Sequence, residues 1–433
     1  MNRPPKTWPF LLLAALSCGD PTSSDHASSA SVASAAPIEP SAPPGARENG
    51  THGAEGPWED EPAPAKFPDG AKSFTKVKET LLANYYSEGV TEDDLYRAAT
   101  AGMLERVDPK MKKWNRLMTA RELAEMKNDL TGEVVGIGVH ISFDSKSGHA
   151  EVLATLPGSP SEKAGLVAGD RIVTVNGKLY KDATLRQVVE DIRGKAGESV
   201  TLSVLRGDKL LPFTVQRARV PFDTPAAMLL TDNVGYVRIP SFTDKTPGAV
   251  RTALEDLAKQ HVQSLILDLR GCPGGSFDRA VETAGSLLME GAPVVTLKRR
   301  GKPEEKHLAK GGGVLVDLPL AVLVDGNTGS SAELVTAALS ENRHARVVGQ
   351  KTLGKWTVQS VDELSNGWAF KYTVSLFKTP SGRSFEGVGL TPDVEVTMDE
   401  KILAKANATP KPEDRLAIDV QLRTAKELLA RRP

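Results

Sequence analysis

PLAVLVDGNTGSSAELVTAAL, residues 319–339, places an apolar segment, a glycine-containing turn and an amphipathic segment in one continuous run. The apolar part, Pro319 to Val324, predicts a strand buried on both faces. Gly326 and Gly329 allow a sharp turn, and apolar residues then recur at helical spacing from Leu334 to Leu339. Ser330 is therefore expected at a strand-to-helix junction, where free N–H groups and the helix dipole favour negative charge on a substrate oxygen.

Lys355 follows Ser330 by 25 positions, in VVGQKTLGKWTVQ, residues 347–359. A serine hydroxyl is a poor nucleophile until a base takes its proton, and a neutral lysine amine can be that base. The free lysine pKa of about 10.4 must then fall to roughly 7–8, which burial away from carboxylates can achieve. The pair predicts serine catalysis without histidine.

The rest of the segment 221–398 alternates strand and helix patterns. Val234 to Ile239 and Ser264 to Leu269 are expected to be strands, and Arg279 to Leu288 is expected to be a helix. The segment 399–433 is expected to form a helical tail. These patterns favour a mixed α/β core that contains Ser330 and Lys355.

The composition bounds the possible functions. The chain has 433 residues, 40% of them hydrophobic, which is enough for two or three domains with apolar cores. Its 54 basic and 55 acidic residues nearly cancel, so charge points neither to nucleic acid nor to anionic lipid. Only Cys18 and Cys272 occur, which is too few for a disulfide framework, and neither has the paired ligands of a zinc site. We expect no metal and no cofactor.

The amino terminus has the pattern of an export signal. Arg3 and Lys6 precede an apolar stretch from Trp8 to Leu16 that is too short to span a bilayer. Cys18 directly after this stretch resembles a bacterial lipoprotein signal, in which the cysteine is lipidated, although an ordinary cleaved signal is the alternative. Residues 19–68 are rich in Ser, Ala and Pro and predict a tether. We expect an exported protein of the cell envelope or periplasm, anchored through Cys18.

Residues 69–131 have a helical pattern. Thr91 and Asp94 can form a capping box at a helix start, and Asp108-Pro109 ends the periodic run. Residues 132–220 instead show short strand patterns with one helical stretch near Leu185 to Ile192. We assign the first segment to a small helical unit without chemistry of its own.

The segment 132–220 resembles a PDZ domain. The resemblance rests on Gly136-Ile137-Gly138-Val139, on the turn GSPSEKAGLVAGD and on DRIVTVNG, residues 170–177. A glycine-flanked loop leading into an exposed strand edge can present N–H groups to a terminal carboxylate and accept an extended peptide. The alternative is that these glycines only permit tight turns. The resemblance implies that Gly136, Ile137, Gly138 and Val139 bind the C-terminal ends of protein substrates.

Residues from about Thr91 to Val396 resemble the carboxy-terminal processing peptidases, also called tail-specific proteases. In that family the nucleophile lies three residues before a glutamate, here Ser330 before Glu333, and the general-base lysine follows at the position of Lys355. Gln359 matches the family's glutamine and, on a strand, would share a side with Lys355 and orient its amine.

The likeness extends to DLRGCPGG, residues 268–275, and to two late segments, residues 379–383 and 387–393, that we interpret as scaffold. It implies that the N–H groups of Gly275 and Ser331 hold the oxyanion. Trp356 stands where the family usually has glycine, Ala332 where it has serine, and Cys272 where it commonly has asparagine.

Other interpretations of the same residues fit less well. Residues 349–355 match most of a phosphate-binding loop, but Trp356 stands where Ser or Thr would bind magnesium. A histidine base from His261, His307 or His344 lacks a catalytic setting, and Cys272 lacks a visible base partner. Lys355 as a solvated lysine with Ser330 as a mere helix cap is the remaining alternative.

The sequence thus predicts an α+β multidomain protein with a small helical unit, a PDZ-like β domain and a mixed α/β serine peptidase core. We expect a serine endopeptidase that binds the C-terminus of protein or peptide substrates and cleaves them through an acyl-enzyme. A non-catalytic envelope protein that binds peptides through the PDZ domain is the alternative. Natural substrate, cleavage-site preference and oligomeric state have no signal in the sequence.

Overall fold

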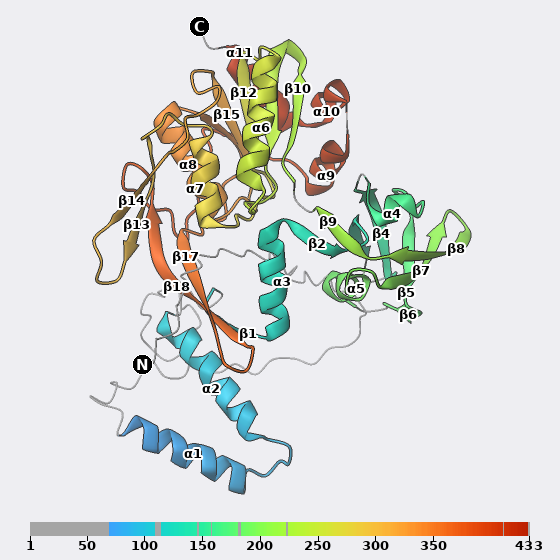
Figure 1. Ribbon diagram of the computed structural model, residues 1–433, viewed down its shortest axis with the longest axis vertical. Helices are drawn as coiled ribbons and strands as arrows, with labels where there is room; N and C mark the ends of the chain where they lie inside the picture. The colour runs from blue at the N-terminus through green and yellow to red at the C-terminus, as the bar shows by residue number, and fades with distance from the viewer. Residues whose placement is uncertain are drawn as a thin grey trace, which may run out of the picture. The chain divides into compact units, whose positions relative to one another are not determined.

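The computed structural model of the chain (Figure 1) describes residues 69–108, 114–144, 147–156, 158–180, 183–221, 224–409 and 411–431. Its contacts divide the chain into two compact units, one from Cys18 to Met103 and one that contains Leu104–Pro433. The export signal, with Cys18, and the tether up to residue 68 lie outside the described residues, as does Pro109.

The described part of the first unit consists of α1 (Gly70–Asn84) and most of α2 (Glu92–Val107). The expected capping box starts α2: the Thr91 N–H donates to Asp94, and the Asp94 N–H donates to the Thr91 hydroxyl. Phe74 of α1 stacks on Tyr96 of α2 with 6.0 Å between ring centroids. The first unit is therefore a pair of helices in contact through their aromatic side chains.

The second unit contains a six-stranded sheet in the order β10-β11-β12-β15-β16-β19. Its strands are β10 (Ala226–Leu230), β11 (Val234–Arg238), β12 (Ser264–Asp268), β15 (Leu320–Val324), β16 (Arg346–Gly349) and β19 (Val394–Glu395). All neighbours are parallel except β10 and β11. Parallel strands place their carboxyl ends at one edge, and there β15 delivers the chain to Ser330.

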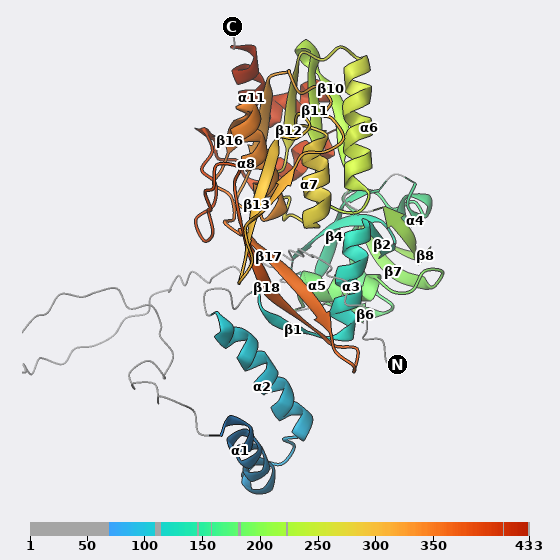
Figure 2. The same ribbon diagram turned by 60° about the vertical axis from the view of Figure 1, so that its left-hand side comes forward.

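Helices cover both faces of this sheet (Figures 1 and 2). Leu267 of β12 and Val322 of β15 belong to one apolar cluster with α6 (Thr246–Lys259), α7 (Phe277–Gly285) and α8 (Ser331–Arg343). Ile266 and Leu323, the alternate residues, belong to the opposite cluster with α11 (Val420–Ala430). The continuous apolar run of β15 is thus explained by burial on two faces.

A second, antiparallel sheet has the order β1-β18-β13-β14, with β17 also paired to β18. It consists of β1 (Arg116–Met118), β13 (Pro293–Arg299), β14 (Glu305–Leu308), β17 (Thr357–Glu363) and β18 (Ala369–Lys378). β1 pairs with β18, and α3 (Ala120–Thr131) follows it after a capping box of Thr119 and Glu122. Lys355 lies two residues before β17, so the chain passes directly from the lysine into this sheet.

Residues 139–216 form a separate antiparallel sheet in the order β3-β4-β5-β7-β8, with β6 beside β5. Its elements are β3 (Val139–Asp144), β4 (His149–Thr155), α4 (Pro160–Lys163), β5 (Arg171–Val175), β6 (Lys178–Leu179), α5 (Leu185–Ile192), β7 (Ser199–Arg206) and β8 (Lys209–Gln216). β2 (Glu133–Gly136) pairs with β9 (Ala218–Pro221) where the chain enters and leaves this part. The helix at Leu185–Ile192 and the strand pattern match the sequence prediction.

The last described helices are α9 (Glu400–Ala408), α10 (Pro412–Ile418) and α11. α10 and α11 reach the end of β12 through a buried charge network. Arg270 donates to Asp268 at 2.6 and 2.9 Å and to Asp419 at 2.8 and 2.9 Å, and all three side chains are fully buried. Burial alone would raise the pKa of Asp268, but the Arg270 guanidinium holds it well below its ordinary value.

The observed architecture is the mixed α/β arrangement with several sheets that the sequence predicted. The strands expected at Val234–Ile239, Ser264–Leu269 and Pro319–Val324 form within one residue of those bounds at each end. The helix expected at Arg279–Leu288 begins two residues earlier, at Phe277, and ends at Gly285, because Ser276 caps its start.

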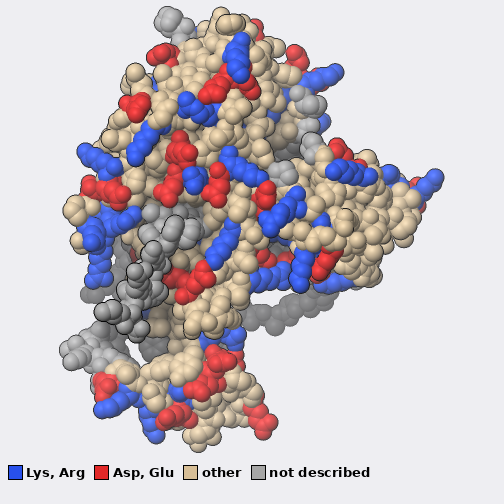
Figure 3. Space-filling view, viewed as in Figure 1, with Lys and Arg blue, Asp and Glu red and all other residues tan. Residues whose placement is uncertain are grey.

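Acidic and basic side chains are interspersed on the face drawn in Figure 3, in line with the balanced composition. Among the described helices, none combines the length and apolarity needed to cross a membrane. Nor do the described residues include three or more His, Cys, Asp or Glu side chains grouped so as to hold a metal ion.

Asp170 should stabilise the sheet of residues 139–216 in a pH-dependent way. Its carboxylate is buried and accepts two hydrogen bonds of 2.7 Å from Arg206, which hold the pKa of Asp170 below its ordinary value of 3.8. A lowered pKa stabilises the folded state at neutral pH, and this contribution disappears as the pH falls through the folded-state value. Asp170→Asn should therefore cost about 2 kcal/mol at pH 7 and much less under strongly acidic conditions.

Hydrogen exchange of the β5 and β7 amides in the full chain measures this loss. Asp208→Asn, in the exposed turn after β7, is the matched control and should leave exchange unchanged. Equal protection in Asp170→Asn and wild type at pH 7 would contradict the assignment.

Candidate active site

Ser330 occupies a strained turn between β15 and α8. Its backbone has φ 56° and ψ −117°, a left-handed conformation that a residue with a Cβ rarely adopts. The side chain is fully buried, and its hydroxyl has no hydrogen-bond partner in the described part of the chain. Strain at a residue with an unsatisfied hydroxyl is a feature of functional sites, because only the surrounding structure can maintain it.

Glu333 maintains that turn and joins it to the lysine segment. Its fully buried carboxylate accepts the Ser330 N–H at 2.8 Å and the Lys355 N–H at 2.9 Å, both on Oε2. Its Oε1 accepts the Gly354 N–H at 2.8 Å and the Thr352 hydroxyl. One carboxylate thus holds the backbones of Ser330 and Lys355 side by side.

Lys355 is fully buried, just before β17. Its Nζ lies over the indole ring of Trp114, 4.1 Å from the ring centroid. The Glu333 carboxylate accepts the backbone N–H of Lys355, as described above. The structure therefore brings Ser330 and Lys355 into one buried region with an aromatic face at the amine.

Gln359 lies two residues inside β17 and is also fully buried. Its Nε2 donates to the hydroxyls of Thr357 at 2.8 Å and Thr373 at 3.4 Å, whereas its Oε1 has no hydrogen-bond partner among the described residues. β17 begins only at Thr357, and a register shift falls between Val358 and Gln359. The simple alternation expected from Lys355 to Gln359 is therefore interrupted, and the role of Gln359 as orienter stays a prediction.

The glycine loop after β12 packs directly against the serine turn. A Cβ on Gly274 would lie 3.0 Å from the Ser330 Cβ and 3.1 Å from the Ser331 nitrogen. Gly275 has φ 138°, and a Cβ there would lie 2.3 Å from the Phe242 carbonyl oxygen. The Ser331 hydroxyl donates to the Gly275 carbonyl at 3.3 Å. Gly274 thus permits the close approach of the serine turn, Gly275 permits that of Phe242, and the two predicted oxyanion residues, Gly275 and Ser331, lie together.

Asp325 and Thr328 hold this loop against the turn. Both carboxylate oxygens of Asp325 accept the Gly271 N–H at 3.0 Å, and the Thr328 hydroxyl donates to the Leu269 carbonyl at 2.8 Å. The Gly329 N–H donates to the Cys272 carbonyl at 2.9 Å. The serine turn and the glycine loop therefore form one hydrogen-bonded assembly.

The residues predicted to bind peptide lie where β2 leads into β3. Gly136 pairs with Ala218 inside the β2–β9 ribbon, whereas Ile137 is buried in the apolar cluster of this part. Gly138 has φ 78°, and a Cβ there would lie 2.4 Å from the Ser159 Cβ. Val139 begins β3, which is the edge strand of its sheet in the described residues. An edge strand preceded by a glycine loop can accept an extended peptide.

The positions that depart from the family pattern are buried. Trp356 is fully buried against Phe377 and Phe385, with ring centroids 4.7 and 5.2 Å away, so its indole fills the core and does not line an open cleft. The Cys272 thiol is also fully buried, with its Sγ 4.0 Å from the Gly274 carbonyl oxygen. Both side chains therefore pack in the core beneath the loops of the site.

The alternative histidines lie elsewhere in the second unit. His344 caps the C-terminal end of α8, opposite the end that carries Ser330, and His261 follows α6. His307 lies on β14 with its ring 5.1 Å from that of Phe277. These positions give no support to a histidine base.

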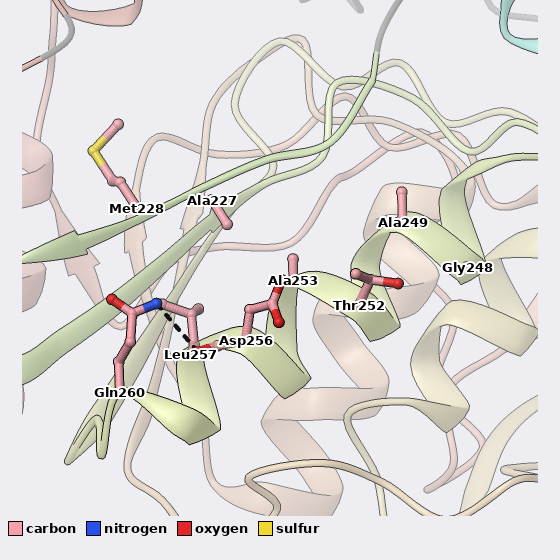
Figure 4. Close-up of a pocket in the computed structure, with 9 residues that line it drawn as sticks. All are labelled: Ala227, Met228, Gly248, Ala249, Thr252, Ala253, Asp256, Leu257 and Gln260. Atoms are coloured by element: carbon pink, nitrogen blue, oxygen red, sulfur yellow. Dashed lines mark hydrogen bonds between the residues drawn. The ribbon is translucent and has the colours of Figure 1, made fainter.

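A groove of ≈ 540 Å³ lies between β10 and α6 (Figure 4). Small side chains such as Ala227, Ala249 and Ala253 line it, and its carboxylate, Asp256, pairs with Lys259 at 2.8 Å. The Gln260 amide donates to the Asp256 carbonyl at 3.1 Å. The Asp256 side chain is 57% exposed and already paired with a surface lysine, so the groove is a poor candidate for chemistry.

Three residues of the site were not predicted from the sequence. Glu333 was noted only for its spacing from Ser330, although its distance of three residues also fits a capping box. Thr352 bonds Glu333 from a loop with no distinctive pattern. Trp114 comes from a segment more than 200 positions before Lys355, and no local signal predicts that contact.

Comparison with known proteins identifies the family of the chain. Residues 233–396 match the model of peptidase family S41, and residues 151–206 match that of the PDZ domain. The chain is 30% identical to a carboxy-terminal-processing protease of Bartonella bacilliformis over 75% of this chain and 74% of that one. It is 32% identical to a carboxyl-terminal-processing protease of Synechocystis over 73% of each.

Among solved structures, a Bacteroides fragilis protein described as a candidate S41 protease aligns with a TM-score of 0.57 and 17% identity, over 86% of this chain and all of that one. This likeness shows a shared fold. The resemblance that the sequence suggested is thereby confirmed at the level of the family. With an S41 peptidase domain, a PDZ domain and relatives of this similarity, the chain belongs to the carboxy-terminal-processing proteases and is a serine peptidase.

Proposed function

We propose that the protein cleaves polypeptides by Ser-Lys catalysis after binding their C-terminal ends in its PDZ domain. The observation that carries the catalytic part is the shared Glu333 carboxylate, which bonds the backbones of Ser330 and Lys355 at 2.8 and 2.9 Å. Both side chains are fully buried, and burial disfavours the charged form of an amine.

In the proposed reaction the Ser330 Oγ attacks the carbonyl carbon of the scissile bond, and its proton passes to the Lys355 Nζ. The C–N bond then breaks, Lys355 returns the proton to the leaving amine, and water hydrolyses the acyl-enzyme. The N–H groups of Gly275 and Ser331 are the proposed donors to the oxyanion. The available Gln359 Oε1 can accept a hydrogen bond from the amine and so fix its direction.

Peptide binding is proposed at the open edge of β3, with the chain end at Gly136-Ile137-Gly138-Val139. The support is the edge position of β3 and the φ of 78° at Gly138, which turns the backbone directly before the strand. Partly buried Val139, Ile141 and Phe143 pack against the same apolar cluster as Val188 and Ile192 of α5. An apolar residue at the substrate's end would fit such surroundings.

Replacement of the proposed nucleophile and base tests the mechanism. Ser330→Ala and Lys355→Ala should each lower kcat/KM on a disordered protein substrate by at least about 10³-fold, because the first lacks the nucleophile and the second lacks the base. Binding of a peptide with a free C-terminal carboxylate should persist in both variants, as measured by fluorescence anisotropy. Retained cleavage in Ser330→Ala would refute the proposal, and peptide binding without wild-type cleavage would favour the non-catalytic binder.

Glu333 should matter for catalysis although it touches no substrate. Glu333→Gln keeps the size of the side chain but places an NH₂ group against donors, so at least one buried N–H loses its acceptor. We expect a stability loss of about 1–3 kcal/mol and a fall in kcat well beyond the change in KM. Steady-state kinetics at a temperature where both proteins are folded measure this.

Glu341→Gln is the matched control, because Glu341 lies on the same helix and accepts hydrogen bonds from Ser381 and Arg383. It should retain wild-type kcat. Similar kinetics in both glutamine variants would exclude a positioning role for Glu333.

We also propose export with lipidation of Cys18, on the basis of the signal pattern that precedes it. Cys18→Ala in cells should move the protein from the membrane fraction to the soluble fraction and abolish incorporation of a labelled fatty acid. An unlabelled wild-type protein in the soluble fraction would refute lipidation and favour the ordinary cleaved signal.

A further inference from the structure

We propose that Trp114 covers the amine of Lys355 and keeps water from it, so that it acts as a positioning residue for the general base. The inference rests on the proposed function in one respect, namely that Lys355 acts as the base. The contact itself is a property of the structure: the Lys355 Nζ lies 4.1 Å from the centroid of the Trp114 ring.

Burial separates the two partners of this contact. Lys355 is fully buried, whereas Trp114 is partly exposed. The indole therefore reaches the surface, while the buried Nζ lies over its ring. A large rigid ring at this place excludes water that would otherwise solvate the amine.

Asn115, the residue after Trp114, attaches this segment to β18. It is 2% exposed, and its Oδ1 accepts the N–H of Thr373 at 2.9 Å and the hydroxyl of the same residue at 3.2 Å. The Thr373 hydroxyl also accepts a hydrogen bond from the Gln359 Nε2. The covering segment is thus bonded to the strand that contacts the proposed orienting residue.

The strand that follows continues this attachment. β1 pairs with β18 in register from Arg116 opposite Lys371 to Met118 opposite Ala369 (Figure 2). Buried Met118 and Ala369 share an apolar cluster with α3. Trp114 is therefore at the end of a paired strand, which limits how far the ring can move from the amine.

Two effects of the indole on the amine oppose each other. The ring face attracts an ammonium and so favours the charged form. Exclusion of water disfavours the charged form, because a buried ion loses its hydration. We propose that the second effect is the larger, so that the net influence of Trp114 favours the neutral amine that a general base requires.

Two carboxylates bond the backbone around Lys355, and two cations lie further along the neighbouring strands. Glu333 of α8 bonds its backbone N–H, and Glu386, after β18, bonds the N–H of Trp356. Arg116 and Lys371 face each other along β1 and β18, and burial lowers the pKa of Lys371 to about 8. A substitution confined to Trp114 leaves all four of these charges in place, so it isolates the contribution of the cover.

The pH profile of kcat/KM for the full chain tests the proposal. In Trp114→Ala the acidic limb should move upward by about one pH unit, which gives a roughly tenfold loss below the midpoint that disappears on the alkaline plateau. Trp114→Phe keeps an aromatic cover and should stay within about threefold of wild type. Trp368→Ala, in the turn between β17 and β18, is the control and should leave the profile unchanged.

An equal loss at every pH, a midpoint that moves downward, or an unchanged profile would each overturn the proposal. The first outcome would mean a purely structural role, and the second would mean that the cation–π attraction dominates.

A second measurement separates failure of this inference from failure of the proposed function. In a Ser330→Ala background, acetylation of Lys355 by acetic anhydride is followed by mass spectrometry of the digested protein. Trp114→Ala should raise the labelling rate at least about tenfold at a pH above the amine's midpoint, whereas Trp368→Ala should not. An unchanged labelling rate refutes the proposed role of Trp114, even if catalysis depends on Ser330 and Lys355. A raised labelling rate in a Ser330→Ala protein that still cleaves substrate refutes the proposed mechanism but supports the role of Trp114.

Discussion

A single buried carboxylate organises the catalytic region. Glu333 satisfies three backbone N–H groups and one hydroxyl, and these belong to the serine turn and to the segment that ends at Lys355. A buried carboxylate is costly unless every oxygen is well bonded, so the two segments and the glutamate stabilise one another. The left-handed backbone of Ser330 depends on this arrangement, because a hydrogen bond of 2.8 Å from its own N–H holds the turn.

The glycine loop depends in turn on the charge network behind it. Asp268 and Arg270 lie directly before Gly271, and Asp419 and Gln421 reach Arg270 from the C-terminal helices. Removing one partner would leave a buried charge without compensation, which is far more costly than the pair is stabilising. The last helices therefore help to hold the loop that packs on Ser330. The same contacts explain why an aspartate and an arginine are needed in the Asp-Leu-Arg run before this loop.

Much of the fold followed from the sequence because its signals are local. Apolar runs predicted β12 and β15, and the spacing of Thr91 and Asp94 predicted the start of α2. Ser330, Lys355 and Gln359 were proposed from spacing and family resemblance, and the structure places all three in buried positions of one unit. The fourfold hydrogen bonding of Glu333 and the contact of Trp114 were missed because both depend on segments distant in sequence, which periodicity does not reveal.

Burial of the Lys355 amine, which the proposed role as a base requires, depends on segments that are distant in sequence. Lys355 receives its backbone anchor from α8 and its aromatic neighbour from the residues before β1, which are separated by more than 200 positions. An amine in such a place is desolvated only when all these segments are assembled, since each of them excludes water from a different side. Under the proposed Ser-Lys mechanism, reactivity of the serine would therefore depend on completion of the fold, because an unfolded chain carries a solvated, protonated lysine and an inert hydroxyl.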